Sequence, residues 1–240
     1  SCGEHDMASN IIHLVLARVP GASSGTRGLS LFAVPKHFVH TNGSVDESYN
    51  GVNIGRIETK MGYHGTPTCE INFEGAMGYL IGSENKGMAH MFTFMNTARL
   101  GVALQGVNGS EKSFQHALKY SKERRAFRSL VGEQDPFAIA DPIIVHPDIR
   151  RMLLTQKAVA EGGRMMVYTC ALLSDKMISA FEKGDFAAAD AFDAQLGFMT
   201  PIAKGFLTEI GIEATSMGIQ IFGGHGYIRG NKQEQIYRDV

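Results

Sequence analysis

The stretch that decides the fold is GMAHMFTFMNTARLGVALQGVNGSEKSFQHALKYSKERRAF, residues 87–127. It contains no proline, and its apolar residues recur at the spacing of three and four that keeps side chains on one face of a helix. These apolar residues are Met88, Met91, Phe92, Met95, Ala98, Val102, Phe114, Ala117 and Leu118. The spacing predicts one long α-helix, or two nearly collinear ones, with a buried stripe.

Three glycines, Gly101, Gly106 and Gly109, interrupt this predicted helix. Each weakens a helix by about 1 kcal/mol relative to alanine. A helix that keeps them is therefore expected to let another backbone or a ligand come close.

A second long helix is expected after an irregular insert at residues 131–146, which contains two prolines. Pro147 suits a first helical position, and Asp148 places a carboxylate near the positive end of the helix dipole. This helix is expected to run to about residue 183 and to end at Gly184.

A third helical region is expected at residues 185–222. A break is predicted near Thr200-Pro201, because proline lacks the N–H that an inner helical position donates. Gly223 and Gly224 are expected to stop the helix, and residues 231–240 to begin another. Long helices joined by short turns predict an antiparallel four-helix bundle.

The first third of the chain is predicted to be β-structure. Four short runs of β-branched and aliphatic residues have the length of strands; they are residues 11–17, 29–34, 53–59 and 68–73. Residues 74–86 are expected to form a glycine-rich connection. We therefore predict an α+β chain, with a partial β-domain at residues 1–86 and a helical bundle at residues 87–240.

The composition is that of an ordinary globular protein, with 240 residues, a net charge of −1 and 44% hydrophobic residues. It gives no basic footprint for nucleic acid or membrane surfaces, and the longest apolar run is too short to span a bilayer. Cys2, Cys69 and Cys170 are scattered, which predicts neither a disulfide framework nor a zinc site and fits a reducing, cytoplasmic-type compartment. His37 and His40 have no third ligand near them in sequence, so no metal site is expected.

Three local patterns stand out, and each alone has an ordinary structural interpretation. MNTAR at residues 95–99 contains an arginine among apolar residues, which commonly extends its charged head to water. KERRAF at residues 122–127 is a basic helix end that complements the helix dipole. QIFGGHGY at residues 220–227, followed by YRD, contains glycines of the kind that end helices.

Together, in this order and spacing, the patterns resemble the acyl-CoA dehydrogenase family. GLSLFAVPK at residues 28–36 resembles a strand of the family's middle β-domain, and the segments KMG, FEG, LIG and GM between residues 60 and 88 follow the family's path into its first C-terminal helix. The resemblance covers the whole chain. The insert at 131–146 and HPDIRR at 146–151 further resemble one bacterial branch of the family.

The resemblance implies a helical domain, a β-domain and a C-terminal four-helix bundle that bind FAD and remove two hydrogens across Cα–Cβ of an acyl-CoA. It places Asn96 and Arg99 in the segment that contacts substrate. FAD contacts are implied for Ser1, Arg124, Phe127, Gln220, Gly223 and Gly224. A guanidinium can hold two phosphate oxygens, and glycine lets backbone N–H groups approach an anion.

The resemblance also implies partners. Arg124 and Phe127 correspond to residues that reach the FAD of a neighbouring subunit, so a homodimer or homotetramer is expected. Electron-transfer flavoprotein is the implied electron acceptor, and an acyl-CoA the implied substrate.

Two positions depart from the family pattern. Pro147 stands where a glutamine usually contacts FAD, and Ala98 stands where some members have the glutamate that accepts the α-proton. The other expected position for this base would follow Val240. The 240-residue chain alone is therefore expected to lack the catalytic glutamate and to be inactive. Two alternatives stay open: a flavin-dependent monooxygenase on the same fold, which needs no such base, and a non-catalytic helical assembly module.

Overall fold

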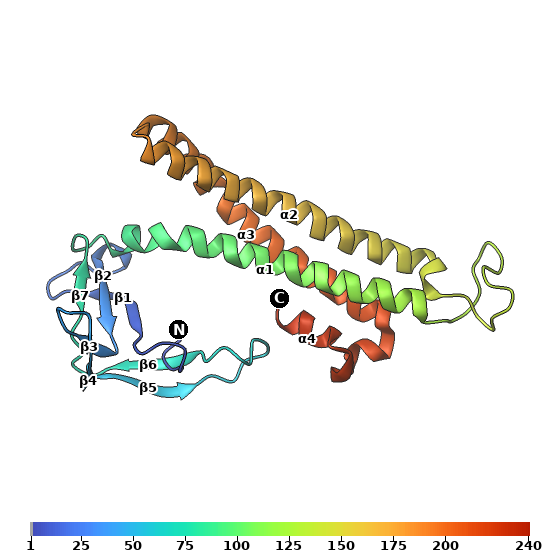
Figure 1. Cartoon of the computed structure of the whole chain (residues 1–240), viewed down its shortest axis with the longest axis horizontal. Helices are drawn as coiled ribbons and strands as arrows, with labels where there is room; N and C mark the ends of the chain where they lie inside the picture. The colour runs from blue at the N-terminus through green and yellow to red at the C-terminus, as the bar shows by residue number, and fades with distance from the viewer. Residues whose placement is uncertain (1) are drawn as a thin grey trace. The chain divides into compact units, whose positions relative to one another are not determined.

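The computed structural model describes residues 2–240, apart from the side chain of Glu47. The chain divides into two compact units, Ser1–Met95 and Asn96–Val240. The strands lie in the first unit, helices make up most of the second, and helix α1 (Gly87–Glu123) begins in one and ends in the other (Figure 1). The expected boundary between residues 86 and 87 stays a prediction.

The strands of the first unit form three small antiparallel sheets with the orders β1-β2-β7, β3-β4 and β5-β6. Their bounds are β1 Ile12–Arg18, β2 Leu29–Pro35, β3 His37–Val39, β4 Val45–Tyr49, β5 Val52–Ile57, β6 Cys69–Phe73 and β7 Tyr79–Ile81. The four expected strands are β1, β2, β5 and β6, so the β-character of this region is confirmed.

The interpretation of residues 74–86 as pure connection is wrong, because it contains strand β7. Glycines on both sides leave only a three-residue run, which is too short for an alternating pattern to be visible. Pairing with β2, in the register Leu31↔Ile81, supplies the backbone hydrogen bonds that such a short strand needs. The hairpin of β3 and β4 was also missed, because β3 has only three residues and β4 (VDESY) contains two acidic residues, which are uncommon in strands.

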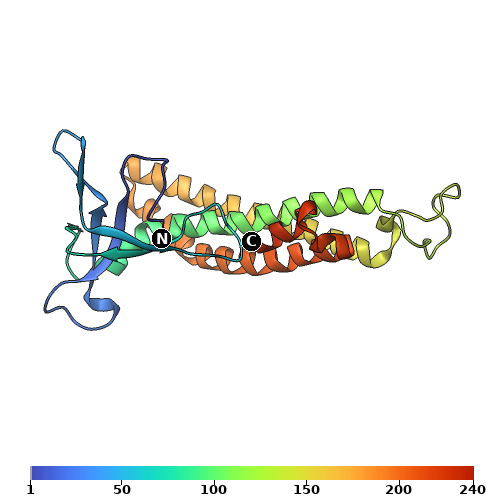
Figure 2. The same cartoon turned by 90° about the horizontal axis from the view of Figure 1, so that it is seen from below.

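The helices of the second unit are α1, α2 (Pro147–Glu182), α3 (Phe186–Phe222) and the short α4 (Gln233–Arg238). α1 is one continuous helix, which settles the choice between one helix and two. Figure 2 shows the three long helices running side by side. Each of them contributes to a shared core of Ala103, Val107, Val167, Cys170, Ala203 and Leu207.

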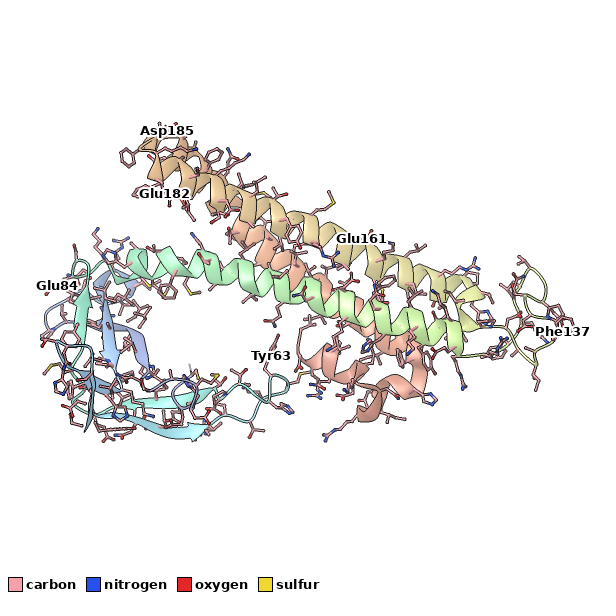
Figure 3. All side chains as sticks on the ribbon, viewed as in Figure 1. Tyr63, Glu84, Phe137, Glu161, Glu182 and Asp185 are labelled. Carbon is pink, nitrogen blue, oxygen red and sulfur yellow. The ribbon has the colours of Figure 1, made fainter. Side chains whose placement is uncertain are left out.

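The turn between α2 and α3 is built as the sequence predicts. Gly184 has a positive φ of 76°, a conformation that glycine adopts without strain. The Asp185 side chain then accepts the backbone N–H of Ala188 at 3.1 Å and caps α3. Glu182 and Asp185 mark this turn in Figure 3.

The predicted break at Thr200-Pro201 is wrong, because α3 continues through Pro201. Pro201 is exposed, and the buried Thr200 donates its hydroxyl to the carbonyl of Leu196 at 2.6 Å. Ala203 and Leu207, both buried in the shared core, hold the next turn against α1 and α2. Tertiary packing therefore outweighs the local preference of proline.

The predicted stripe on α1 is right only in its second half. Phe114 and Ala117 are buried, whereas Ala98 is exposed and Val102 is 36% exposed. The face that α1 buries in the second unit consists mostly of small residues: Ala103, Gly106, Val107, Ser110, Ser113, Phe114, Ala117 and Ser121. A count of apolar residues misses this face because glycine and serine do not register as hydrophobic.

The glycines of α1 serve different purposes. At Gly106 a Cβ would lie 2.3 Å from the carbonyl oxygen of Leu207 on α3, so the expected close approach of another backbone is confirmed there. At Gly109 the neighbour is the side chain of Val240. A Cβ at Gly101 would meet nothing within 4 Å among the described residues.

Four elements meet at a buried polar cluster around Ser113 of α1. Its hydroxyl accepts amide hydrogen bonds from Gln156 of α2 and from Gln233 of α4. The Gln156 amide also donates to the carbonyl of Ala214 on α3 at 2.7 Å. Gly218 of α3 leaves room for this cluster, since its Cβ would lie 2.0 Å from Gln233 Nε2. The cluster fixes α4 against the long helices.

Candidate functional site

The first predicted site lies on α1, just inside the second unit. Arg99 Nη1 donates to Asn96 Oδ1 at 3.4 Å, as two residues spaced by three on a helix can. Both side chains are half-buried, whereas Ala98 between them is exposed. The pair offers a positioned guanidinium and an amide, and Ala98 offers no group that could accept a proton.

The second predicted site depends on an aromatic contact between the C-terminal ends of α1 and α3. The ring of Tyr120 stacks on Phe222 with centroids 4.1 Å apart and planes 13° from parallel. Its hydroxyl lies 3.3 Å from Nδ1 of His225. Beneath this contact Phe222 belongs to an apolar core with Phe114 and Leu153. The two helix ends are therefore held together by a packed interior.

Arg124 and Phe127 follow directly after α1. The N–H of Arg124 donates to the carbonyl of Tyr120 at 2.8 Å, and its carbonyl accepts the N–H of Ile143 at 2.9 Å. Its guanidinium is exposed and forms no ion pair with any residue that the structure describes. Phe127 is 84% exposed and has a φ of 59°, which is uncommon for an aromatic residue.

Gln220, Gly223 and Gly224 stand at the end of α3. Gln220 is exposed, and its carbonyl accepts the N–H of Gly223, which ends the helix with a φ of 58°. A Cβ built on Gly223 or Gly224 would meet nothing within 4 Å in the described part of the chain. Backbone that no side chain covers, next to an exposed amide and near an exposed guanidinium, fits an anionic ligand such as a dinucleotide phosphate.

The structure brings some of the predicted residues together and separates others. Arg124, Phe127 and the Gln220–Gly224 segment share one end of the helical unit, because Tyr120 and Phe222 join the helix ends. Arg124 follows Arg99 by 25 residues, which at the helical rise of about 1.5 Å per residue places them roughly 37 Å apart. One copy of the chain therefore does not bring both arginines to one small ligand. Ser1 lies outside the described residues.

The weaker candidates have ordinary structural partners. His37 packs edge-on against Tyr49, and His40 lies 3.6 Å from the carboxylate of Asp46. Within residues 2–240 no group of three or more potential metal ligands gathers. Glu161 is exposed on α2 (Figure 3) and pairs with Lys157, which is typical of a solvated helix face. The three cysteines are free, and burial raises the pKa of the Cys170 thiol.

Two residues of this site were not predicted. Tyr120 lies one helical turn before Arg124, a spacing that could have suggested it. Asp141 is fully buried in the segment between α1 and α2, where its carboxylate accepts backbone N–H groups. Bonds to backbone leave no signature in side-chain spacing, so no sequence pattern marks Asp141.

A comparison against known families identifies the family of the chain. The model of the acyl-CoA dehydrogenase C-terminal domain matches residues 85–240, a range that begins two residues before α1 and contains all four α-helices. The chain belongs to the acyl-CoA dehydrogenase family. The family is FAD-dependent, and its enzymes are oxidoreductases acting on CH–CH bonds.

Particular relatives are 3-methylmercaptopropionyl-CoA dehydrogenase from Ruegeria pomeroyi, 41% identical over 99% of this chain, and a butyryl-CoA dehydrogenase from Syntrophomonas wolfei, 36% identical over 99%. The chain spans 39% of the length of each. Subunit CarC of the caffeyl-CoA reductase-Etf complex from Acetobacterium woodii is 29% identical over 90% of this chain and 48% of its own length. The first of these relatives belongs to the bacterial branch that the insert and HPDIRR resemble, so this resemblance is confirmed.

Among solved structures, the acyl-CoA dehydrogenase from Bacillus anthracis complexed with FAD superimposes with a TM-score of 0.72 at 23% identity, over 95% of this chain and 35% of that chain. At this identity the likeness shows the fold. Within the described residues, no helix combines the length and the apolar character that crossing a membrane requires.

Proposed function

We propose that this chain is part of an enzyme that uses FAD to dehydrogenate an acyl-CoA thioester between Cα and Cβ. In this proposal residues 1–86 belong to the middle β-domain and residues 87–240 to the C-terminal domain, an antiparallel four-helix bundle. The observation that carries it is the surface at the joined ends of α1 and α3, where an exposed guanidinium and uncovered glycine backbone occur in a chain of this family.

The residues at this surface would hold the dinucleotide. Arg124 would bind a phosphate through charge-assisted hydrogen bonds, and Gly223 and Gly224 would let the backbone come close to it. Gln220 would contribute its amide, and Phe127 would cover a ring of the ligand. When bound, FAD supplies the acceptor for the hydride that leaves Cβ.

Asn96 and Arg99 would position the substrate. The guanidinium of Arg99 can stabilise negative charge that builds on the thioester oxygen as the α-proton leaves. Asn96 holds the guanidinium in place. Ala98 has only a methyl group, so a carboxylate outside this motif must take the proton.

The separation of roughly 37 Å along α1 supports a homodimer or homotetramer. In such an assembly, Arg124 of one copy and Arg99 of another would serve the same reaction. Light scattering at micromolar concentration tests this proposal, and a clean monomer would contradict it.

Electron-transfer flavoprotein is the proposed electron acceptor, in keeping with the relative that is a subunit of an Etf complex. A cytoplasmic location is proposed with it. The alternative with the same fold is a flavin-dependent monooxygenase. It needs no carboxylate base, so Ala98 is compatible with it.

Electron transfer from a panel of acyl-CoAs to an artificial acceptor, with FAD in excess, tests the function. We expect turnover from a longer protein that contains this chain together with a carboxylate base, and none from the 240 residues alone. Oxygen uptake that requires an external reductant, with no oxidation of any acyl-CoA, would favour the monooxygenase. Robust turnover by the 240 residues would show that the base has been misplaced.

A further inference from the structure

The segment between α1 and α2 is organised around one carboxylate. Asp141 is fully buried. Its Oδ2 accepts the N–H of Ser129 at 2.9 Å, and its Oδ1 accepts the N–H groups of Gln134 at 3.0 Å and Asp135 at 2.9 Å. A single side chain thus satisfies three backbone donors of a segment that has almost no regular secondary structure.

The backbone of Asp141 forms hydrogen bonds with Phe127 and with the residue before it. Its carbonyl accepts the N–H of Ala126 at 3.1 Å, and its own N–H donates to the carbonyl of Phe127 at 2.9 Å. One step outward, the N–H of Ile143 donates to the carbonyl of Arg124. These bonds close the segment into a loop and hold Phe127 at its unfavourable φ of 59°.

Within the described residues, the same loop binds the side chains of Arg125 and Arg128 but not that of Arg124. Arg125 forms an ion pair with Asp135 at 2.8 Å and donates to the carbonyl of Ala140. Arg128 donates to the carbonyl of Asp135, and its Nη1 lies 3.5 Å from Asp141 Oδ1. Both guanidinium groups are therefore engaged inside the loop, whereas that of Arg124 has no ion-pair partner among the residues described.

We propose that Asp141 is a positioning residue for the dinucleotide surface: by fixing the loop of residues 125–142, it engages Arg125 and Arg128 internally and presents Arg124 and Phe127 to the ligand. This inference rests on the proposed function. Asp141 itself faces no ligand and acts through the backbone that it holds.

The protonation state agrees with this geometry. The backbone hydrogen bond from Ser129 is the largest cause that holds the pKa of Asp141 below its ordinary value, and further backbone bonds and the charge of Arg128 add to it. The carboxylate is therefore ionised at neutral pH and can act only as an acceptor. An amide of the same size would replace one acceptor oxygen by a donor that faces backbone N–H groups.

The test is Asp141→Asn, with Asp148→Asn as the matched control because Asp148 is an exposed carboxylate on α2. In Asp141→Asn we expect faster amide hydrogen exchange at Ser129, Gln134 and Asp135, no change for amides inside α2 and α3, and an FAD dissociation constant raised about tenfold. Asp148→Asn should match the parent in all three measurements. The thermal midpoint of Asp141→Asn should fall, because buried backbone donors lose an acceptor, so FAD affinity is compared at a temperature where parent and variant are both folded; Asp148→Asn should keep a midpoint close to that of the parent.

A second variant, Arg128→Gln, guards against misfolding of the first, since this side chain is partly exposed. It should loosen the same amides and weaken FAD binding in the same direction. Loss of amide protection with unchanged FAD affinity would overturn the positioning role and leave the proposed function standing. A parent protein that binds no FAD would overturn both, while amide exchange would still report whether Asp141 orders the loop.

Discussion

The glycines inside the helical unit and those at the end of α3 give a useful comparison. At Gly106 and Gly218 an added Cβ would lie 2.3 Å and 2.0 Å from atoms of neighbouring elements. At Gly223 and Gly224 it would meet nothing within 4 Å in the described chain. Both sets lack a side chain, but the first lets helices approach one another and the second leaves backbone open to solvent.

The comparison separates stability from binding. A glycine where two backbones touch contributes to the free energy of unfolding, since any side chain would force the helices apart. Gly223 is explained by its positive φ at the end of α3. Gly224 has empty space around it and no positive φ, so neither packing nor backbone conformation requires a glycine there, whereas a ligand in that space would. Substitutions in the first set should therefore lower the free energy of unfolding, whereas substitutions in the second set should lower FAD affinity.

The largest effect on stability is expected for Gly106→Ala. The new methyl group would overlap the carbonyl oxygen of Leu207, which is backbone and cannot rotate away. We expect a loss of about 2–3 kcal/mol in the free energy of unfolding. Urea unfolding measures it, with Gly101→Ala as the matched control in the same helix.

Gly101→Ala should be neutral or should stabilise the chain by up to about 1 kcal/mol, because the site is open and alanine favours helix. If both substitutions had the same effect, α1 and α3 would not approach as closely as the structure shows.

Arg124→Ala addresses the other side of the comparison. It removes a charge-assisted phosphate contact worth about 1.5–3 kcal/mol, which corresponds to roughly tenfold to hundredfold weaker FAD binding. Stability should change little, since the guanidinium is exposed. Flavin retained on a desalting column measures the effect, and acyl-CoA affinity should fall less.

The control is Arg151→Ala, which removes an exposed guanidinium that pairs with Asp148 on α2. Equal flavin retention by parent and Arg124→Ala would remove Arg124 from the proposed site.

Much of this architecture could be predicted from the sequence, for identifiable reasons. Pro147 and Gly184 mark the ends of α2 through local backbone chemistry alone, and Gly223 does the same for α3. The path of α3 through Pro201 could not be predicted, because it depends on the burial of Ala203 and Leu207 against other helices. Local preferences fix where helices end more reliably than where they continue.

The candidate site shows a similar division. The sequence indicated Arg124 and the glycine pair through the resemblance to a known family, because each motif alone has an ordinary structural interpretation. It did not reveal that Tyr120 and Phe222 join the two motifs, nor that Asp141 orders the loop. Both depend on contacts between residues far apart in the chain, which spacing within one element does not encode.

A smaller loss of stability is expected for Gly218→Ala. Here the overlapping atoms are Gln233 Nε2 and Ser113 Oγ, which belong to side chains and can shift, although both residues are fully buried. We expect about 1–2 kcal/mol. Because α4 is held through Gln233, amide exchange in α4 should increase more than in α2. An equal increase of amide exchange in α4 and α2 would contradict the conclusion that the polar cluster around Ser113 holds α4 in place.

The smallest effect on stability is expected for Gly224→Ala, and it distinguishes most directly between the two kinds of glycine. Gly224 has no positive φ, so alanine fits its backbone, and stability should stay within about 0.5 kcal/mol of the parent. The methyl group would project into the space assigned to the ligand, so FAD affinity should fall about threefold to tenfold. Gly223→Ala is the matched comparison, because its φ of 58° should add a stability loss of about 1–2 kcal/mol. Isothermal titration with FAD and urea unfolding, performed on both variants, separate the two effects. If Gly224→Ala bound FAD as the parent does, the open backbone at the end of α3 would serve only to terminate the helix.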